Sequence, residues 1–140
     1  MIGSAFAIGV SGLEVESRTV EAVASNIANM NDTIRPADAS TATHQKPGGN
    51  PDVYRPVQVA RSSLASGGVR GDMVAVNPPH ELSYSPSDPN ADANGVVARP
   101  NVNLETEFVT MTMSRRTFEA NLKSLRTADA MMGALLNAKI

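Results

Sequence analysis

Few residues in this chain are suited to catalysis, and they lie in its Pro-rich middle. His44 and His80 are the only histidines, and cysteine is absent from the 140 residues. The absence of cysteine excludes thiolate nucleophiles, disulfides and Cys-ligated metals. A paired histidine site needs a nearby carboxylate, which the spacing does not supply. A small hydrolase using His44 or His80 is therefore a weak alternative, and we interpret both as exposed loop residues.

The segment Asp88 to Asn94 suggests calcium chemistry, because from Asn90 onward it is similar to the first half of an EF-hand loop. Oxygen-bearing side chains alternate there, and Gly95 takes the place of the loop glycine. The twelfth position is Asn101, where calcium needs a bidentate Glu. A small calcium-binding module is thus a second alternative. We favour a polar turn held by Asx-type hydrogen bonds.

Composition narrows the function further. Twelve Lys and Arg against fourteen Asp and Glu give a net charge of -2, whereas proteins that bind nucleic-acid phosphates usually carry a basic excess. Aromatic residues make up 4% of the chain, and Trp is absent, which argues against a deep ligand pocket. No phosphate-binding loop, dinucleotide fingerprint or nucleophile elbow occurs. We predict a protein that is not an enzyme, with no nucleic-acid partner, cofactor or metal.

Pro and Gly divide the chain into three parts. Residues 13–34 contain neither, residues 35–100 contain all nine prolines, and residues 101–140 contain only Gly133. Because Pro and Gly interrupt helices, we predict an N-terminal helix within 1–34, a loop and small β insert in 35–100, and a long C-terminal helix in 101–140. The expected fold is α+β, with the two helices packed as a coiled-coil-like hairpin.

Both ends carry apolar residues in alternating steps of four and three, which is typical of a coiled-coil seam. The predicted assembly residues are Leu13, Val20, Val23, Ile27, Leu104, Phe108, Met111, Phe118, Leu122, Leu125, Met132 and Leu136. Asn103 is expected to cap the C-terminal helix. Asp129 interrupts the seam, and we favour a position at the seam's edge or facing a basic group on another subunit over a buried acid. Glu119 is expected to pair with Lys123.

The middle of the chain reads as short strands. Alternation over Val53–Val59 and over Val69–Val76, with Gly67 and Gly68 between them, predicts a hairpin. Residues 81–84 and 95–98 can add two more strands. Residues 35–52 are expected to be a loop.

The sequence has neither a candidate membrane span nor the features of a cleaved secretory signal. No segment reaches the roughly 18 apolar residues of a membrane span, so we do not expect an integral membrane protein. The apolar opening has no Lys or Arg before Arg18 and lacks the basic start of a secretory signal. We therefore expect no export by the cleaved-signal route.

Three blocks of residues carry a family resemblance. The segment Ser25-Asn26-Ile27-Ala28-Asn29 resembles the Ser-Asn-(Ile/Leu)-Ala-Asn signature of flagellar rod, hook and hook-associated proteins. Residues 88–103 resemble the Pro-x-Ala-Asp…Gly…Pro-Asn-Val block of the FlgC family of flagellar basal-body rod proteins, and residues 114–121 are similar to that family's Ser-Arg…Ala-Asn segment. The matched residues are Ser25, Asn26, Ala28, Asn29, Asp92, Gly95, Pro100, Asn101, Ser114, Arg115, Glu119, Ala120 and Asn121. Val96 and Phe118 depart from it by replacing the family's common Tyr.

The resemblance implies a structural subunit of the proximal rod, the drive shaft that transmits torque from motor to hook. It further implies helical assembly with itself and with other rod proteins, and contact with the MS ring and export-gate adaptor proteins. Family members leave the cytoplasm through the flagellar type III apparatus without a cleaved signal and reside in the periplasmic rod. The terminal helices would form an inner tube with the β insert outside it. Another rod or hook protein of the same superfamily is the third alternative.

Overall fold

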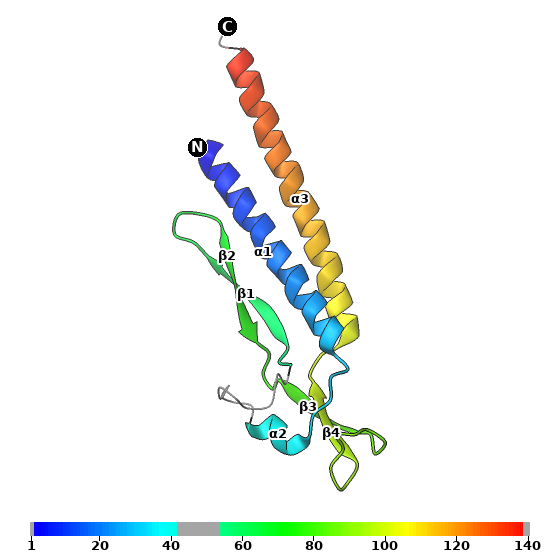
Figure 1. The fold of residues 1–140 in the computed structure, drawn as a ribbon. Helices are drawn as coiled ribbons and strands as arrows, with labels where there is room; N and C mark the ends of the chain where they lie inside the picture. Colours follow the sequence, from blue (N-terminus) through cyan, green and yellow to red (C-terminus); the bar gives the residue numbers. More distant parts are fainter. Residues whose placement is uncertain (1, 42–53, 139–140) are drawn as a thin grey trace.

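The protein is elongated, and two long helices dominate it (Figure 1). The computed structural model describes residues 2–41 and 54–138. Helices α1 (Ile2–Asn29) and α3 (Leu104–Asn137) run antiparallel and pack against each other. Between them come α2 (Pro36–Thr41), β1 (Val57–Ser63), β2 (Val69–Ala75), β3 (His80–Tyr84) and β4 (Val96–Pro100). The predicted α+β class, with terminal helices and a small β insert, is confirmed.

Helix α3 begins as the sequence predicts. The side chain of Asn103 accepts a hydrogen bond from the Thr106 amide at 2.8 Å, which satisfies one of the free amides of the first turn. Glu105 and Glu107 lie in that turn, where the helix dipole favours anions. With 34 residues, α3 is about 50 Å long. It extends past the N-terminal end of α1 (Figure 1).

The β insert consists of two separate two-stranded antiparallel sheets. In the first, β1 pairs with β2, from Val57 opposite Ala75 to Ser63 opposite Val69. Its turn contains Gly67 and Gly68, both at positive φ, a conformation that glycine adopts without steric cost. This hairpin lies along α1, so the helix is packed on two sides.

The second sheet lies at the lower end of the molecule in Figure 1 and pairs β3 with β4. The chain leaving α1 joins it through Ile34, which exchanges two backbone hydrogen bonds of 2.9 Å with Ala98. Val97 and Ala98 are almost completely buried. The exit of α1 is therefore fixed to the strand that leads into α3.

Three details of the insert differ from the sequence prediction. Pro36 starts the six-residue helix α2 where a loop was expected, because its fixed φ suits the first turn of a helix. Strand β1 starts at Val57, so Tyr54 precedes it, and Pro56 is buried. Strand β4 starts one residue after Gly95 and runs to Pro100. The rest of the expected loop, and Val53, lie outside the described residues.

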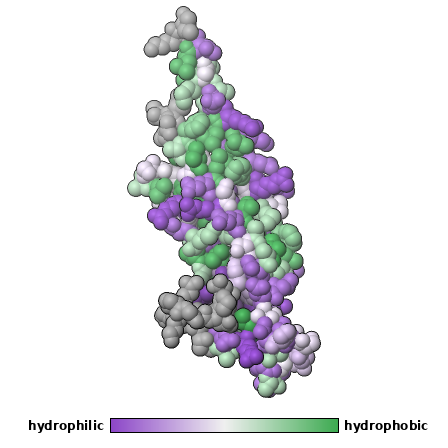
Figure 2. Space-filling view, viewed as in Figure 1, coloured by the Kyte–Doolittle hydropathy of each residue, from purple (hydrophilic) through white to green (hydrophobic). Residues whose placement is uncertain are grey.

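The core is small and lies mainly where α1 meets α3 and the hairpin. The buried apolar residues among those described are Val15, Ala22, Val23, Val97, Ala98, Leu125 and Ala128. Apolar side chains remain exposed along the helices, beside polar patches (Figure 2). None of the helices in the described ranges is long and apolar enough to cross a membrane.

Candidate functional site

Asn26 joins three elements at the lower end of the helix pair. Its amide nitrogen donates to the Val57 carbonyl at 2.9 Å and to Glu107 Oε1 at 2.7 Å. Its amide oxygen accepts from the Val57 amide at 3.0 Å and from the Tyr54 hydroxyl at 2.7 Å. Only 2% of Asn26 is exposed. A side-chain amide carries both donors and an acceptor, so Asn26 pairs with β1 as a neighbouring strand would.

The two titratable partners of Asn26 have shifted pKa values. Burial raises the pKa of Glu107, and the hydrogen bond from Asn26 partly opposes this shift. Burial also raises the pKa of Tyr54, while its hydrogen bond with Ser25 lowers it and the nearby Glu107 carboxylate raises it further. The Tyr54 hydroxyl lies 3.1 Å from Ser25 Oγ. This junction of Ser25, Asn26, Tyr54, Val57 and Glu107 thus fixes α1, β1 and α3 relative to one another.

The other residues of the Ser-Asn-Ile-Ala-Asn signature take simpler positions. Asn29 donates to the Ser25 carbonyl at 2.8 Å and so bonds backbone in the last turn of α1. Ile27 is half-buried and Ala28 is exposed. Asn26 is therefore the signature residue that links the elements, and Asn29 acts within its own helix.

The helices approach closely where α1 carries glycine. A Cβ atom on Gly9 would lie 2.7 Å from Leu125 Cδ2, and one on Gly12 would lie 2.6 Å from Asn121 Nδ2. Real Cβ atoms do not approach other atoms so closely, so a larger residue at either position would force Leu125 or Asn121 to move. Together with the contact between Asn26 and Glu107, these positions define the antiparallel register of the pair.

Burial along α3 agrees with the predicted seam only at every second position. Leu104, Met111, Phe118, Leu125 and Met132 are buried or half-buried within the subunit. Thr110 and Leu122 are half-buried as well. Glu107, Ser114, Asn121 and Ala128 are also covered, and they alternate with the first set in steps of three and four. Their small or polar side chains gave no apolar signal, and only their contacts with α1 reveal them.

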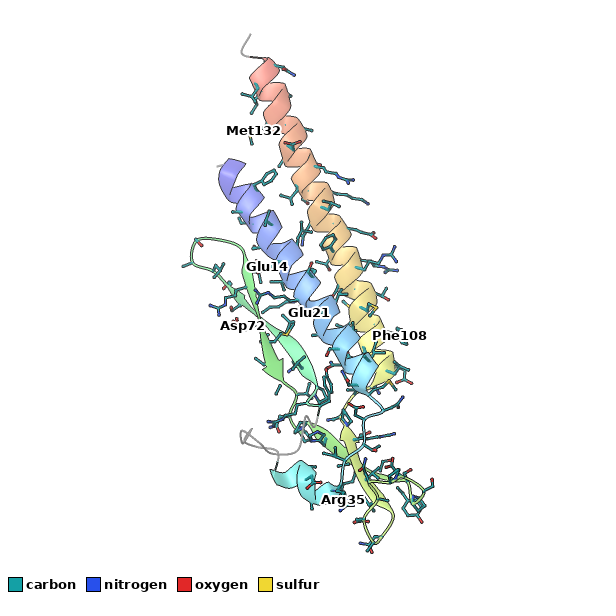
Figure 3. All side chains as sticks on the ribbon, in the orientation of Figure 1. Glu14, Glu21, Arg35, Asp72, Phe108 and Met132 are labelled. Carbon is teal, nitrogen blue, oxygen red and sulfur yellow. The ribbon has the colours of Figure 1, made fainter. Side chains whose placement is uncertain are left out.

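The remaining predicted seam residues range from buried to exposed. Phe108 is 54% exposed and Leu136 is 65% exposed. Leu122 is half-buried, and Asp129 is exposed, which excludes the less favoured interpretation as a buried acid. On α1, Val23 is buried, Leu13 and Ile27 are half-buried, and Val20 is exposed. Figure 3 shows Phe108 at the lower end of α3 and Met132 near its upper end.

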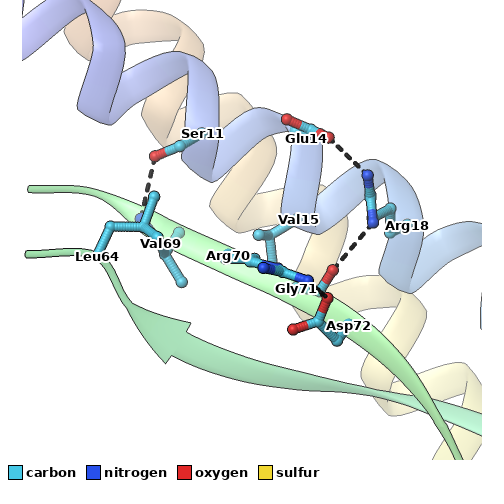
Figure 4. Close-up of a pocket in the computed structure, with 9 residues that line it drawn as sticks. All are labelled: Ser11, Glu14, Val15, Arg18, Leu64, Val69, Arg70, Gly71 and Asp72. Carbon is cyan, nitrogen blue, oxygen red and sulfur yellow. Dashed lines mark hydrogen bonds and ion pairs between the residues drawn. The ribbon is translucent and has the colours of Figure 1, made fainter. Parts of the chain in front are cut away.

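Helix α1 also bonds the free edge of β2 through two polar side chains. Ser11 Oγ accepts from the Val69 amide at 3.1 Å, and Arg18 donates to the Gly71 carbonyl at 3.1 Å (Figure 4). Unpaired strand edges invite association with other chains. Asn26 at one end of the hairpin and this pair at the other therefore protect both of its edges in part.

A groove of about 370 Å³ lies beside these contacts. Its lining residues are Ser11, Glu14, Val15, Arg18, Leu64, Val69, Arg70, Gly71 and Asp72 (Figure 4). Its charges pair locally, since Arg18 bonds Glu14 and Arg70 bonds Asp72, each at 2.8 Å. We assign the groove no chemistry beyond holding the hairpin on α1.

The block around β4 forms turns. Asp92 accepts from the amides of Asn94 and Val96 at 2.8 and 2.9 Å. The hydrogen bond from Val96, followed by that from Asn94, lowers the pKa of Asp92. Gly95 has a φ of +75°, and a Cβ there would lie 2.9 Å from Pro86 Cβ.

The same block ends where the chain enters α3. Pro100 is buried, and Asn101 bonds the carbonyls of Pro79 and Pro78, each at 3.0 Å. These contacts connect the end of β4 to the chain before β3. They give Pro100 and Asn101 a structural role in directing the chain into α3.

The alternative chemistries gain no support. Asp88 accepts from the Asn90 amide at 2.8 Å, which is an Asx-type turn as expected. No group of three potential metal-ligating side chains occurs within residues 2–41 and 54–138. His80 Nε2 contacts the Tyr54 carbonyl at 3.0 Å, and His44 lies outside the described residues.

The Ser-Arg…Ala-Asn block has an inner and an outer side. Ser114 is 2% exposed, and Asn121 lies beside Gly12. Arg115, Glu119 and Ala120 are exposed. Glu119 forms an ion pair with Arg115 at 3.2 Å. The sequence predicts Lys123 as its partner instead.

Sequence reasoning missed the polar residues of α1 that bond the hairpin. Glu16 is buried and pairs with Arg61 of β1 at 3.0 Å. Ser11, Arg18 and Asn26 bond backbone groups of the hairpin. The available signal was the polar stripe on an otherwise apolar helix, because buried polar groups require partners.

Comparison with known protein families agrees with this architecture. A model described as "Flagella basal body rod protein" matches residues 6–36, and one described as "Flagellar basal body rod FlgEFG protein C-terminal" matches residues 93–138. The two matches cover most of α1 and the segment that follows it, and β4 with all of α3.

Relatives align along nearly the whole chain. The flagellar basal-body rod protein FlgC of Salmonella typhimurium strain LT2 is 36% identical over 133 residues, covering 91% of this chain and 90% of the relative. FlgC of Agrobacterium fabrum strain C58 is 32% identical, with 97% and 94% covered. FlgC of Bacillus subtilis strain 168 is 29% identical, with 89% of each covered. The chain belongs to the FlgC family of flagellar basal-body rod proteins.

Proposed function

We propose that this protein is a structural subunit of the proximal rod of the flagellar basal body, the shaft that transmits torque from motor to hook. The observation that carries this function is its likeness to FlgC proteins along the whole chain. The described part of the molecule adds a second support, because it is built from long helices and turns, with apolar side chains left on the outside. Such a molecule is suited to a mechanical role and not to catalysis, so we propose no enzymatic activity.

We further propose that α1 and α3 form a coiled-coil-like pair that lines the inner tube of the rod. The support is the alternation of three- and four-residue steps among the covered residues of α3. Leu13, Val20, Phe108, Leu122 and Leu136 then lie at or beyond the edge of the pair and contact neighbouring subunits. A subunit interface that does not close on itself produces a filament.

The proposed partners are copies of this chain, other rod proteins, and the MS-ring and export-gate proteins at the base of the rod. The proposed location is the periplasmic rod, reached through the flagellar type III apparatus without a cleaved signal. Family resemblance supports these assignments.

Deleting the gene and isolating basal bodies tests the function. We expect basal bodies that retain membrane rings but lack a rod and hook, and cells that do not swim. Expression of the wild-type chain from a plasmid should restore both. Complete rods in the deletion strain would contradict the proposed function.

A further inference from the structure

Helix α3 has one extensive neighbour although it is the longest element. Among the described elements it packs extensively only on α1, whereas α1 also packs on both strands of the hairpin. Most of the circumference of α3 is consequently exposed, including Val109 and Met113. Because a helix in a protein gains most of its stability from packing, we expect the exposed side of α3 to pack against another molecule.

An outer stripe runs along the exposed side of α3 in alternating steps of four and three residues, the spacing of a coiled-coil seam. Arg116 and Lys123 are its two cations, and neither has an ion pair within residues 2–41 and 54–138. Neighbouring Arg115 is already paired with Glu119. The members of the outer stripe of α3, all exposed, are Val109, Met113, Arg116, Ala120, Lys123, Thr127 and Ala130.

Helix α1 carries an outer stripe of the same kind. Glu14 and Glu21 are its two anions (Figure 3). Glu14 is paired with Arg18, while Glu21 has no ion pair in the part of the chain that the structure describes. The members of the outer stripe of α1, all exposed, are Val10, Glu14, Ser17, Glu21, Ala24 and Ala28. The two stripes carry opposite charges and do not pair with each other within the subunit.

The two stripes match in charge when they are aligned antiparallel. Glu14 and Glu21 are seven residues apart, as are Arg116 and Lys123, and both spans are about 10 Å along a helix. Placing Glu21 opposite Arg116 therefore brings Glu14 opposite Lys123. Two ion pairs form in one register, and the order of three- and four-residue steps agrees along both helices.

The same register also places small side chains of one stripe opposite large side chains of the other. Ala24 and Ala28 of α1 fall opposite Met113 and Val109 of α3, so small side chains meet large ones. Met113 is 63% exposed and Val109 is 59% exposed within the subunit. Burying them against alanine removes apolar surface from water, and the small residues let the helices approach closely.

Hydroxyl groups near the cations do not oppose burial. Thr127 lies on the outer stripe of α3, and Thr117 and Ser124 follow Arg116 and Lys123 directly. The three hydroxyls donate to carbonyls four residues earlier, at 3.0 to 3.1 Å. Because these hydroxyls already have partners, burying them leaves no unsatisfied donor.

We propose that the outer stripe of α3 docks side by side on the outer stripe of α1 in a second copy of this chain. The proposal rests on the proposed function and names the partner for these two surfaces. It follows from the complementary charges, the common seven-residue spacing and the pairing of small with large side chains. Electrostatic complementarity of this kind fixes register and partner choice.

The match also gives a direction of growth. Within one subunit Gly12 lies beside Asn121, so Glu21 is roughly one helical turn from the level of Arg116. Placing Glu21 against Arg116 of the neighbour shifts that neighbour by about 6 Å along the helices. Each copy then offers one basic and one acidic stripe, and the contact repeats without closing.

Charge reversal in the purified full-length chain tests the proposal. One variant carries Glu14→Lys and Glu21→Lys, a second carries Arg116→Glu and Lys123→Glu, and a third carries all four changes. Sedimentation velocity at low and high salt measures association, and urea unfolding verifies that each variant is folded. Loss of the exposed ion pair between Glu14 and Arg18 should cost little stability. If the first variant nevertheless unfolds, Glu21→Lys alone replaces it.

A matched control reverses the exposed pair Glu81 and Arg99, which lies on the second sheet and away from both stripes. We expect salt-sensitive association of the wild type and about tenfold weaker association of each two-residue variant. Association should recover in an equimolar mixture of these two variants and in the four-residue variant. The control should associate as the wild type does.

Three results would overturn the proposal. They are a wild type that stays monomeric at every salt concentration, association that the reversals leave unchanged, and a four-residue variant that does not recover. If the wild type stays monomeric but the reversals abolish swimming, the stripes belong to an interface with a different rod protein. The gene deletion tests the proposed function independently of these variants, so the function can hold even if the two stripes do not bind each other.

Discussion

The two long helices share a spacing of apolar residues but have different neighbours. Helix α1 packs on α3 with one side and on the hairpin with another, and its polar residues bond both neighbours. Helix α3 packs extensively on α1 and exposes Phe108, Val109, Met113 and Leu135. The difference indicates that α1 holds the subunit together, whereas α3 has surface left for its neighbours. Substitutions that separate these two roles are therefore the most informative.

The largest expected effect comes from two leucines on opposite sides of this division. Leu125→Ala should lower the free energy of unfolding by about 3 kcal/mol, because Leu125 is 8% exposed and packs against Gly9. Leu136→Ala should change it by less than about 0.5 kcal/mol, because Leu136 is mostly exposed. Urea unfolding of the purified variants measures both. If both variants lost the same free energy of unfolding, the stability of the subunit would not depend mainly on the side of α3 that contacts α1.

The junction asparagine provides the second comparison. Asn26→Ala should cost about 2 kcal/mol, because it leaves buried backbone groups of Val57 and the Tyr54 hydroxyl without their partner. Asn29→Ala, which removes a bond within α1, should cost about 0.5 kcal/mol. Thermal unfolding followed by circular dichroism measures the difference. If Asn29→Ala proved the more damaging, the junction would not be the main link between the elements.

Two glycines test the close approach of the helices. Gly9→Ala should destabilise by about 1 kcal/mol, because its methyl group would overlap Leu125. Gly133→Ala should instead stabilise by about 0.5 to 1 kcal/mol, because nothing lies within 4 Å of its Cβ position and alanine is the better helix former. Both are read from urea midpoints. A stabilising Gly9→Ala would mean that the helices are farther apart than the structure shows.

The smallest expected effect is a pH dependence at Glu107. Burial raises its pKa in the folded state above the ordinary value of 4.5. Its contribution to stability is therefore fully present below the unfolded-state pKa and is lost as pH rises through the folded-state pKa. Glu107→Gln should remove this decline while leaving an acceptor for Asn26. Unfolding measured from pH 4 to pH 7 would disprove the assignment if both proteins declined equally.

The sequence predicted the elements better than their contacts. The distribution of Pro and Gly predicted the two helices, and Gly67-Gly68 between valine-rich runs predicted the hairpin, because local backbone preferences determine both features. The side of α3 that contacts α1 was predicted at only half of its positions. Ser114 and Ala128 are buried and Asn121 is half-buried beside Gly12, but these small or polar side chains give no apolar signal in the sequence.

The sequence predicted which residues matter at the candidate site but not which contacts they make. Asn26 was identified from the family signature alone. Its partners Val57 and Glu107 lie far along the chain, and no spacing rule connects them. Ser11, Arg18 and Glu16 were missed for the same reason. Tertiary contacts of polar helix residues depend on how the hairpin crosses α1, which only the folded structure gives.

The central claim is that the outer side of α3 serves assembly rather than folding, and Phe108 tests it most directly. Phe108→Ser changes a side chain that is 54% exposed. We expect the purified variant to unfold within about 0.5 kcal/mol of the wild type. Basal bodies isolated from cells that express only this variant should lack complete rods. Normal rods in those cells, or a variant that fails to fold, would contradict the claim.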